Sequence, residues 1–397
     1  MTAPPSPQPV VLLAPHLLDG TGAAAVPDAA LWLGGGRIAF AGPAAELPLE
    51  ARGLATLELP GCTLLPGLVD VHVHLVASAA PDLAAGIPPT ESERTLAAVA
   101  NARRHLNGGV TLVRDLGAPG GEAIAVGRAV EAGTVEGPRV IAAGPAVTMT
   151  GGHIPYIGRV ADGPEQMRAA VRANFGMGAG CIKVVATGGV LTKGLDPRLA
   201  AYTQPELDAL VAEAHRLGLR VTAHAIGEGG VAAALRAGVD SVEHGMYLDD
   251  ETIRLFVETG TRYSATFMAP GCILRGESVP DWIKQRARPV AEAHLASFQA
   301  AVKAGVRVVA GTDAGTPENP HGRVGHEVVA MVEAGLDVLA GVRAAAAEAA
   351  DLLGEPDRGV LRAGAVADVL AVEGEVAADV TALTRPAAVF QSGRRVR

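Results

Sequence analysis

Cysteine is scarce in this chain of 397 residues, which contains only Cys62, Cys181 and Cys272. An odd number of widely spaced cysteines excludes a disulfide framework and offers no thiolate zinc site. Positive charge is also in deficit, because the formal net charge at pH 7 is −9. A protein that binds nucleic acid usually carries a basic surplus, so we expect no nucleic-acid partner.

Long apolar runs are absent as well. The first residues, MTAPPSPQP, contain neither the basic stretch nor the apolar stretch of a signal peptide. No apolar run reaches the roughly 20 residues that a membrane-spanning helix needs. We therefore predict a cytoplasmic protein without a membrane partner, in which residues 1–8 form a flexible tail.

Aromatic residues make up only 3% of the chain, but hydrophobic residues as a whole reach 49%. Mean hydropathy is +0.28, which argues against disorder and for a well-buried core. A chain of this length is too long for one small core. It is typical of one large domain with an accessory domain, or of two domains.

The middle of the chain repeats one pattern, in which a helical stretch ends in glycine and a β-forming run follows at once. RLG precedes LRVTAHA, for example, and KAG precedes VRVVAGTDAG. Glycine adopts the left-handed conformation after a helix at little energetic cost. In TQPELDALVAEAHRLG, Thr203 and Glu206 form a plausible capping box and Gly218 ends the helix. The pattern predicts alternating helices and parallel strands.

Eight such strands are predicted, and they favour a (β/α)8 TIM barrel of class α/β. No glycine-rich phosphate loop follows the first strand, which argues against a doubly wound sheet. Both ends of the chain contain short strands and turns, including a strand–turn–strand at LWLGGGRIAFAG. We predict one small β-sandwich domain from residues 9–66 and 363–397, flanking a barrel over 67–362. The predicted strands are 67–75, 110–116, 139–145, 181–187, 219–225, 239–244, 261–267 and 306–313.

Side chains that bind metals fall at the ends of these strands. In LVDVHVHL, His72 and His74 stand two residues apart and therefore share one face of a strand. A lone histidine in a strand is more often a core residue, but a set on several strands is hard to assign to chance. Nitrogen and oxygen ligands without thiolate suit zinc, manganese, iron or cobalt. The further members of the set are Lys183, His224, His244 and Asp313.

Lys183 cannot be an ordinary ligand, because a charged ammonium is repelled by divalent cations. Burial and positive neighbours would lower its pKa and favour the neutral amine. A neutral amine can take up carbon dioxide and form a carbamate, which is anionic and has two oxygens. We therefore expect a carboxylated Lys183 that bridges two metal ions.

Taken together, LLPGLVDVHVHL, IKVVATGGV, VTAHA, VDSVEHG and GTDAG resemble the amidohydrolase superfamily. The likeness is closest to its binuclear branch of Xaa-Pro dipeptidases (prolidases), carboxypeptidase-like enzymes and imidazolonepropionase-like proteins. The resemblance implies that His72, His74 and Asp313 hold the more buried of two divalent ions. It implies that His224 and His244 hold the more exposed ion, with carboxylated Lys183 between them. Zinc is the expected metal, with manganese, iron or cobalt as alternatives.

The chemistry of such a site is hydrolysis. A water molecule that bridges two metal ions becomes hydroxide near neutral pH, and Asp313 would act as general base and then general acid. We expect cleavage of an amide bond in a dipeptide, Xaa-Pro or similar, or in an N-acyl amino acid. The alternatives are hydrolysis of a cyclic amide, lactone, carbamate or ester at the same site, an isomerase or deaminase reaction, and a non-catalytic scaffold relative.

Further residues are weaker candidates. His153, in TGGHIPY, is expected to bind the substrate carbonyl, or else to be a structural loop residue. Tyr247 is a candidate for substrate contact, and the segment 268–290 is either a lid or packing. Possible anchors for a substrate carboxylate are Arg114, Tyr156 and Arg159. His321 and His326 are predicted either to shape the pocket or to lie in a solvated loop. His105, His215 and His294 are predicted to lie on the surface or at helix ends. By analogy with other large barrels, we expect a homo-oligomer.

Overall fold

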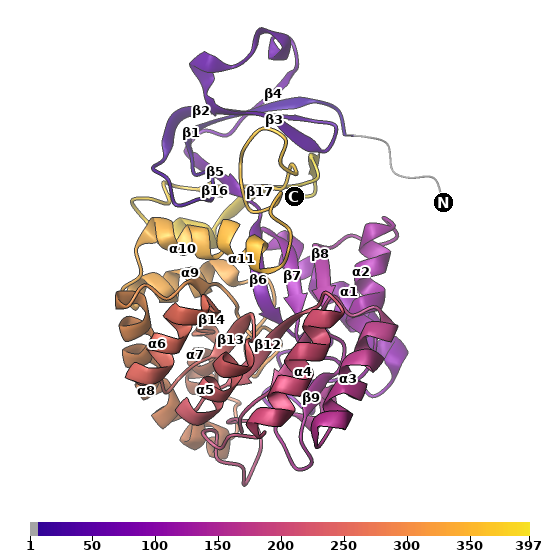
Figure 1. Ribbon diagram of the computed structural model, residues 1–397. Coiled ribbons are helices and arrows are strands. Elements are labelled where there is room, and N and C mark those ends of the chain that lie inside the picture. Colours follow the sequence, from indigo (N-terminus) through magenta and orange to yellow (C-terminus); the bar gives the residue numbers. More distant parts are fainter. Residues whose placement is uncertain (1–6) are drawn as a thin grey trace.

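The computed structural model describes residues 7–397, so the predicted tail over residues 1–8 lies outside the described residues except for 7 and 8. Figure 1 shows a strand-rich part, formed by both ends of the chain, beside a larger part in which helices surround parallel strands. None of the helices in residues 7–397 combines the length and apolar character needed to cross a bilayer.

The larger part is a mixed α/β fold built on parallel strands. Strands β6, β7 and β8 form a three-stranded sheet, and the other seven form a second sheet in the order β10-β9-β11-β12-β13-β14-β15. All eight predicted strands are present, whereas β9 and β10 were not predicted. The strands are β6 (Leu68–Val73), β7 (Val110–Asp115), β8 (Arg139–Ala142), β9 (Ala146–Thr148), β10 (Gly158–Val160), β11 (Cys181–Val185), β12 (Arg220–Ala225), β13 (Ser241–His244), β14 (Arg262–Ser264) and β15 (Val308–Val309).

The two sheets are connected by isolated hydrogen bonds and not by continuous strand pairing. The amide of Asp313, beyond β15, donates to the carbonyl of His72 at 2.8 Å, and the amide of His74 donates to Ala314 at 2.9 Å. On the other side, the amide of Gly180 donates to Ala142 at 2.9 Å. Strand pairing thus gives two parallel sheets, and the closed eight-stranded barrel stays a prediction. The contact between β6 and the segment after β15 brings the two ends of the predicted ligand set together.

The helices follow the strands in alternation, as the glycine pattern predicts. The capping box of Thr203 and Glu206 is present at the start of α4, and Gly218 after it has a φ of 74°. Apolar helix faces pack against the strands and form the largest core cluster. The helices are α1 (Glu91–Asn107), α2 (Glu122–Glu131), α3 (Pro164–Met177), α4 (Gln204–Arg216), α5 (Glu228–Ala237), α6 (Asp250–Thr259), α7 (Met268–Arg275), α8 (Asp281–Lys303), α9 (Val324–Glu333), α10 (Val338–Ala344) and α11 (Ala347–Leu352).

The strand-rich part is one eight-stranded sheet that combines both ends of the chain. Strand β5 pairs antiparallel with β16, which joins the N-terminal strands to the C-terminal ones. The predicted turn at LWLGGGRIAFAG is present, with Gly35 and Gly36 at φ 60° and 79°. The division into two layers of a sandwich stays a prediction. The strands are β1 (Val10–Leu17), β2 (Val26–Gly34), β3 (Arg37–Pro43), β4 (Ala55–Glu58), β5 (Cys62–Pro66), β16 (Val369–Glu373), β17 (Pro386–Gln391) and β18 (Arg394–Arg395).

Candidate metal centre

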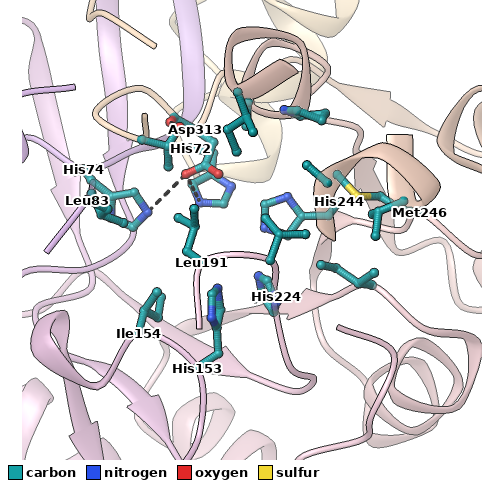
Figure 2. A pocket seen from close by; sticks show the side chains of 18 of the residues that line it. His72, His74, Leu83, His153, Ile154, Leu191, His224, His244, Met246 and Asp313 are labelled. Atoms are coloured by element: carbon teal, nitrogen blue, oxygen red, sulfur yellow. Dashed lines mark hydrogen bonds and ion pairs between the residues drawn. The ribbon is translucent and has the colours of Figure 1, made fainter. Parts of the chain in front are cut away.

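Five histidine rings form a continuous row in the interior of the larger part (Figure 2). Neighbouring ring centroids are 5.4 Å apart for His74 and His72, 5.3 Å for His72 and His244, and 4.6 Å for His244 and His224. The row ends at His153, whose ring centroid lies 4.9 Å from that of His224. All five side chains are buried. Such a row of imidazoles is poor core material unless their nitrogens bind something.

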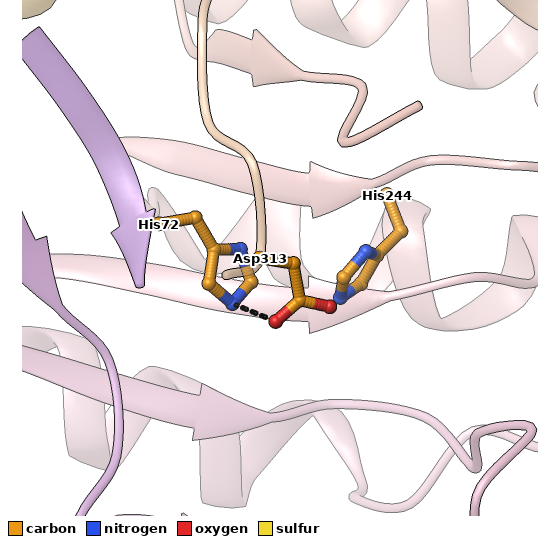
Figure 3. A group of neighbouring side chains, drawn as sticks. All are labelled: His72, His244 and Asp313. Atoms are coloured by element: carbon orange, nitrogen blue, oxygen red, sulfur yellow. Dashed lines mark ion pairs between the residues drawn. The ribbon is translucent and has the colours of Figure 1, made fainter. Parts of the chain in front are cut away.

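Asp313 lies against one end of this row. Its Oδ1 is 3.3 Å from Nε2 of His72 and 3.2 Å from Nε2 of His74. One ligand atom from each of His72, His244 and Asp313 lies within 4.8 Å of the other two (Figure 3). This spacing allows one cation to contact all three side chains.

Lys183 extends from β11 into the same pocket and is only 1% exposed. Its Nζ has no hydrogen-bond partner in residues 7–397, and Oδ1 of Asp313 has none either. Burial lowers the pKa of Lys183 to about 8. Since buried polar atoms are normally paired, these two orphaned atoms indicate that a further group belongs in the pocket that both residues line. The site therefore fits the predicted divalent metal ions.

The tautomers of the four predicted histidine ligands follow from their hydrogen bonds. In each ring, one nitrogen must donate, because its partner can only accept. Thr266 accepts from His244 because its own hydroxyl donates to the Ala265 carbonyl at 2.6 Å. The other nitrogen of each ring keeps a free lone pair, as metal-binding histidines require. The pairs are His72 Nδ1 with Glu243 (3.0 Å), His74 Nδ1 with the Gly117 carbonyl (3.2 Å), His224 Nε2 with the Gly188 carbonyl (2.8 Å) and His244 Nδ1 with Thr266 (2.8 Å).

Electrostatics keep most of these rings neutral. Burial lowers the pKa of His72 to about 4 and that of His224 to about 3, and Lys183 adds to both effects. Burial also places the pKa of His244 well below its usual value. Neutral imidazoles are the form that binds metal, so the lone pairs of these three rings are available at pH 7. At His74, burial lowers the pKa but the contact with Asp313 outweighs it and raises the pKa.

Two of the predicted ligands have unusual backbone conformations. His244 has a φ of 79° and Asp313 a φ of 57°, in the left-handed region that non-glycine residues rarely adopt. Such strained positions are found preferentially at functional sites, where the surrounding structure holds them. At His244 the left-handed turn ends β13, so that Glu243 and His244 both reach the histidine row although they are neighbours in the chain.

A buried network that the sequence analysis missed lies beneath His72. Glu243 is fully buried and is hydrogen-bonded to His72 and to Arg114, whose Nη2 donates at 2.7 Å. Arg114 also donates to the Val71 carbonyl at 2.7 Å and to Ser241 at 3.1 Å. Burial raises the pKa of Glu243, but Arg114 and His72 outweigh it and hold that pKa below its usual range. The only sequence signal was a glutamate inside the predicted strand 239–244, directly before His244 in VDSVEHG.

Arg114 is therefore not an anchor for a substrate carboxylate, because its donors are used within the core. The prediction of His321 as a pocket residue is also wrong. Its Nε2 is hydrogen-bonded to the Ala77 carbonyl at 2.8 Å, and its Nδ1 lies 3.0 Å from Nε2 of His105. His105 and His294 were predicted to lie on the surface or at helix ends. His105 is in the last turn of α1 but is buried, and His294 is buried in the middle of α8. Helix α1 packs His105 toward His321, and His294 stacks on Phe267 with ring centroids 4.3 Å apart. Neither interaction leaves a signal in local sequence.

The pocket itself is lined by all six predicted ligands and by His153. Among the other candidates, Tyr156, Arg159 and Tyr247 do not line it. Tyr247 and His326 each face a separate surface groove. The segment 268–290, predicted as lid or packing, forms α7 and the start of α8 and supplies part of the wall.

Comparison with known proteins agrees with this geometry. A profile of the amidohydrolase family matches residues 63–396. Ochratoxinase from Aspergillus niger is 33% identical over 398 residues, which span 91% of this chain and 81% of that protein. A solved Xaa-Pro dipeptidase with bound methionine in its active site has a TM-score of 0.90 and 31% identity, covering 98% of this chain and all of the other.

A solved structure of a putative prolidase from Bifidobacterium longum is similar too, with a TM-score of 0.85 and 30% identity over 99% of this chain and 95% of that one. The family match covers most of the sequence, and these similar proteins carry the names of hydrolases. The chain therefore belongs to the amidohydrolase family and is a hydrolytic enzyme.

Proposed function

We propose that this enzyme hydrolyses an amide bond with two divalent metal ions, with Asp313 as general base and then general acid. The observation that carries the proposal is the pocket wall itself. There the four tautomer-fixed histidines lie beside the orphaned atoms of Lys183 and Asp313. A core without a bound group would leave these polar atoms unsatisfied.

The ligands divide by position along the histidine row. His72, His74 and Asp313 would hold one ion, and His224 and His244 the other, with Lys183 as a carbamate between them. Zinc suits this donor set, as do manganese, iron and cobalt. Bound ions of this kind lower the pKa of a water molecule and polarise a substrate carbonyl. Formation of the carbamate joins the neutral Lys183 amine to carbon dioxide and releases one proton.

Asp313 is placed to carry the proton of the reaction. Its carboxylate accepts a proton from the attacking water as the new bond to the carbonyl carbon forms. It then donates that proton to the amide nitrogen, which leaves with the electrons of the broken carbon–nitrogen bond. Amines are poor leaving groups unless protonated, so this second transfer matters most for amide substrates.

His153 would donate a hydrogen bond to the substrate carbonyl. Its ring is held by Thr192, whose Oγ1 lies 2.8 Å from Nδ1, and it faces the same pocket as the ligands. We expect His153→Ala to lower kcat by about 100-fold, the effect of removing one donor to a developing oxyanion. Metal content should stay at the wild-type value, because His153 is outside the ligand set. Steady-state kinetics with elemental analysis checks both, and a loss of metal would contradict this role.

The names of the similar proteins favour a dipeptide, Xaa-Pro or similar, or an N-acyl amino acid as substrate. A cyclic amide, lactone, carbamate or ester is the alternative at the same site. Deamination, isomerisation and a non-catalytic scaffold role receive no support from the names of these relatives.

Elemental analysis of the purified protein tests the proposal. We expect two equivalents of metal per chain and loss of activity toward a panel of amides when a chelator removes them. Activity should return when zinc, manganese or cobalt is added back. A folded protein that binds no metal after incubation with each ion would refute the metal-dependent mechanism.

We also propose that the two parallel sheets form one closed barrel. Hydrogen bonds from Val71 to Ala310 at 3.1 Å and from Gly180 to Ala142 at 2.9 Å support this, because they bridge the sheets on both sides. In such a barrel the ligands lie at the C-terminal ends of the strands, where barrel enzymes have their active sites. The domain limits at 66/67 and 362/363, the cytoplasmic location and the homo-oligomer stay predictions from the sequence.

A further inference from the structure

Apart from the predicted ligands, few of the residues that line the catalytic pocket are polar. Only His153 and Thr316 are polar among the other lining residues. Among residues 7–397, no arginine lines the pocket, and Lys183 is the only lysine that does. Figure 2 shows apolar side chains, among them Leu191 and Met246, around the histidine row. The apolar lining consists of Leu83, Ile154, Val190, Leu191, Ile226, Met246, Ala269, Pro270, Ile273, Ala287 and Val290.

The cations closest to this wall are already bound elsewhere. Arg286, on α8, donates to the carbonyls of Gly189 and Val190 at 3.1 Å each, and also to Leu195. These bonds hold the loop after β11 in place and engage two of the three nitrogens of Arg286, which does not line the pocket. Lys193, in the same loop, lies over the ring of Trp282 at 4.9 Å from its centroid.

The arginines expected to bind a substrate carboxylate do not reach the pocket. Arg114 is held by Glu243 beneath the histidine row, and Arg159 on β10 is outside the lining. Arg198 pairs with Asp196 at 3.6 Å and lies near the ring of Tyr247, in the neighbouring groove. A substrate carboxylate that lies against the apolar wall, away from the proposed metal ions, would therefore lose its hydration without gaining a positively charged side chain as partner.

We propose that the pocket selects amides whose groups on both sides of the scissile bond are apolar and uncharged, and that it discriminates against a free carboxylate. This inference rests on the proposed amide hydrolysis, but it departs from the free dipeptides and N-acyl amino acids that the names of similar proteins favour, because the lining of this pocket offers their carboxylate no arginine. Apolar groups gain free energy when the wall removes them from water. A free carboxylate that lies against this wall loses its hydration, and no arginine lines the wall to pair with it. Blocked amino-acid derivatives and N-acyl amines fit this pocket, whereas free dipeptides and N-acyl amino acids fit it poorly.

Matched substrate pairs test the inference on the metal-loaded, full-length enzyme. N-hexanoylpyrrolidine differs from N-hexanoyl-L-proline only by the carboxylate, as N-hexanoyl-phenethylamine does from N-hexanoyl-L-phenylalanine. We expect kcat/KM to be about 100-fold higher for the uncharged member of each pair. A preference of at least 10-fold supports the inference, and a smaller preference or one for the acid overturns it.

The two proposals fail in different ways. If neither member of a pair is hydrolysed, the proposed amide hydrolysis is contradicted for these substrates. The unconverted compounds then act as plain ligands, and calorimetry compares their affinities directly. Tighter binding of the uncharged member by 10-fold or more still supports the inference, and anything less overturns it.

A charge added to the wall supplies a second measurement. Leu191 is partly exposed and lines the pocket, so Leu191→Arg can present a guanidinium without a fully buried charge. We expect this variant to reduce the preference for the uncharged substrate by at least 10-fold. The matched variant Leu191→Gln is polar but uncharged, and its preference should stay within threefold of the wild type. An equal change in both variants would show that charge is not what the wall discriminates.

Discussion

Lys183→Ala is expected to lower the bound metal from two equivalents to one or none and to reduce kcat/KM by about 1,000-fold or more. The lysine lines the same pocket as both groups of predicted histidine ligands, and its Nζ has no partner in residues 7–397. If a carbamate bridges the ions there, alanine removes two oxygen ligands and one negative charge at once. Elemental analysis and kinetics on the same preparation measure both effects.

A chemical rescue distinguishes a Lys183 carbamate that bridges the metal ions from a lysine that only supports the fold. Alanine removes most of the lysine side chain and leaves space in the pocket. A small carboxylic acid such as acetate or propionate should enter this space and restore part of the activity and of the metal content. Lys183→Met keeps the volume of the side chain and serves as a second variant if alanine weakens folding. Lys193→Ala, in the loop after β11, is the matched control and should retain both metal ions. Unchanged metal content in both Lys183 variants would rule out the bridge.

The second large effect is expected at Glu243. We expect Glu243→Gln to weaken metal binding by about 10- to 100-fold, because the carboxylate fixes the tautomer and orientation of His72. The same change leaves the buried guanidinium of Arg114 without its charge partner, so the free energy of unfolding should fall by about 3 kcal/mol. Competition with a chelating dye measures the metal affinity, and urea unfolding measures the stability.

Two further variants distinguish orientation of His72 from general destabilisation. Glu213→Gln also removes a buried glutamate paired with arginine, on α4, and should leave metal affinity at the wild-type value. The double variant Arg114→Met/Glu243→Gln removes the unpaired charge and should regain stability while metal binding stays weak. Recovery of metal affinity together with stability would mean that Glu243 acts only through the fold.

The positions of the predicted ligands could be read from the sequence because each depends on local rules. Side chains alternate along a strand, so His72 and His74 had to share one face wherever that strand lay. Strand ends marked by glycine placed Lys183, His224, His244 and Asp313 at one level of the fold. The pocket lining contains all of them. The division of these residues between two metal ions comes from the family resemblance, and this division stays a proposal.

The supporting residues were not readable in the same way. Glu243 contacts Arg114 at a separation of 129 residues in the chain, and His105 contacts His321 at a separation of 216. Arginine is as common on surfaces as in sites, and nothing near Arg114 in sequence distinguishes a core ion pair from a substrate anchor. The wrong prediction for Arg114 arose because the choice depends on a partner from a distant strand.

The local sequence decided which segments form helices and strands, because glycine caps and strand alternation act over a few residues. For the same reason it decided where the predicted metal-binding side chains lie along the strands. Tertiary contacts alone decided which nitrogen of each histidine stays free, which cations remain unpaired, and how apolar the walls are. Those properties depend on what lies opposite each side chain after folding. The opposite residue comes from a strand or loop far away in the sequence.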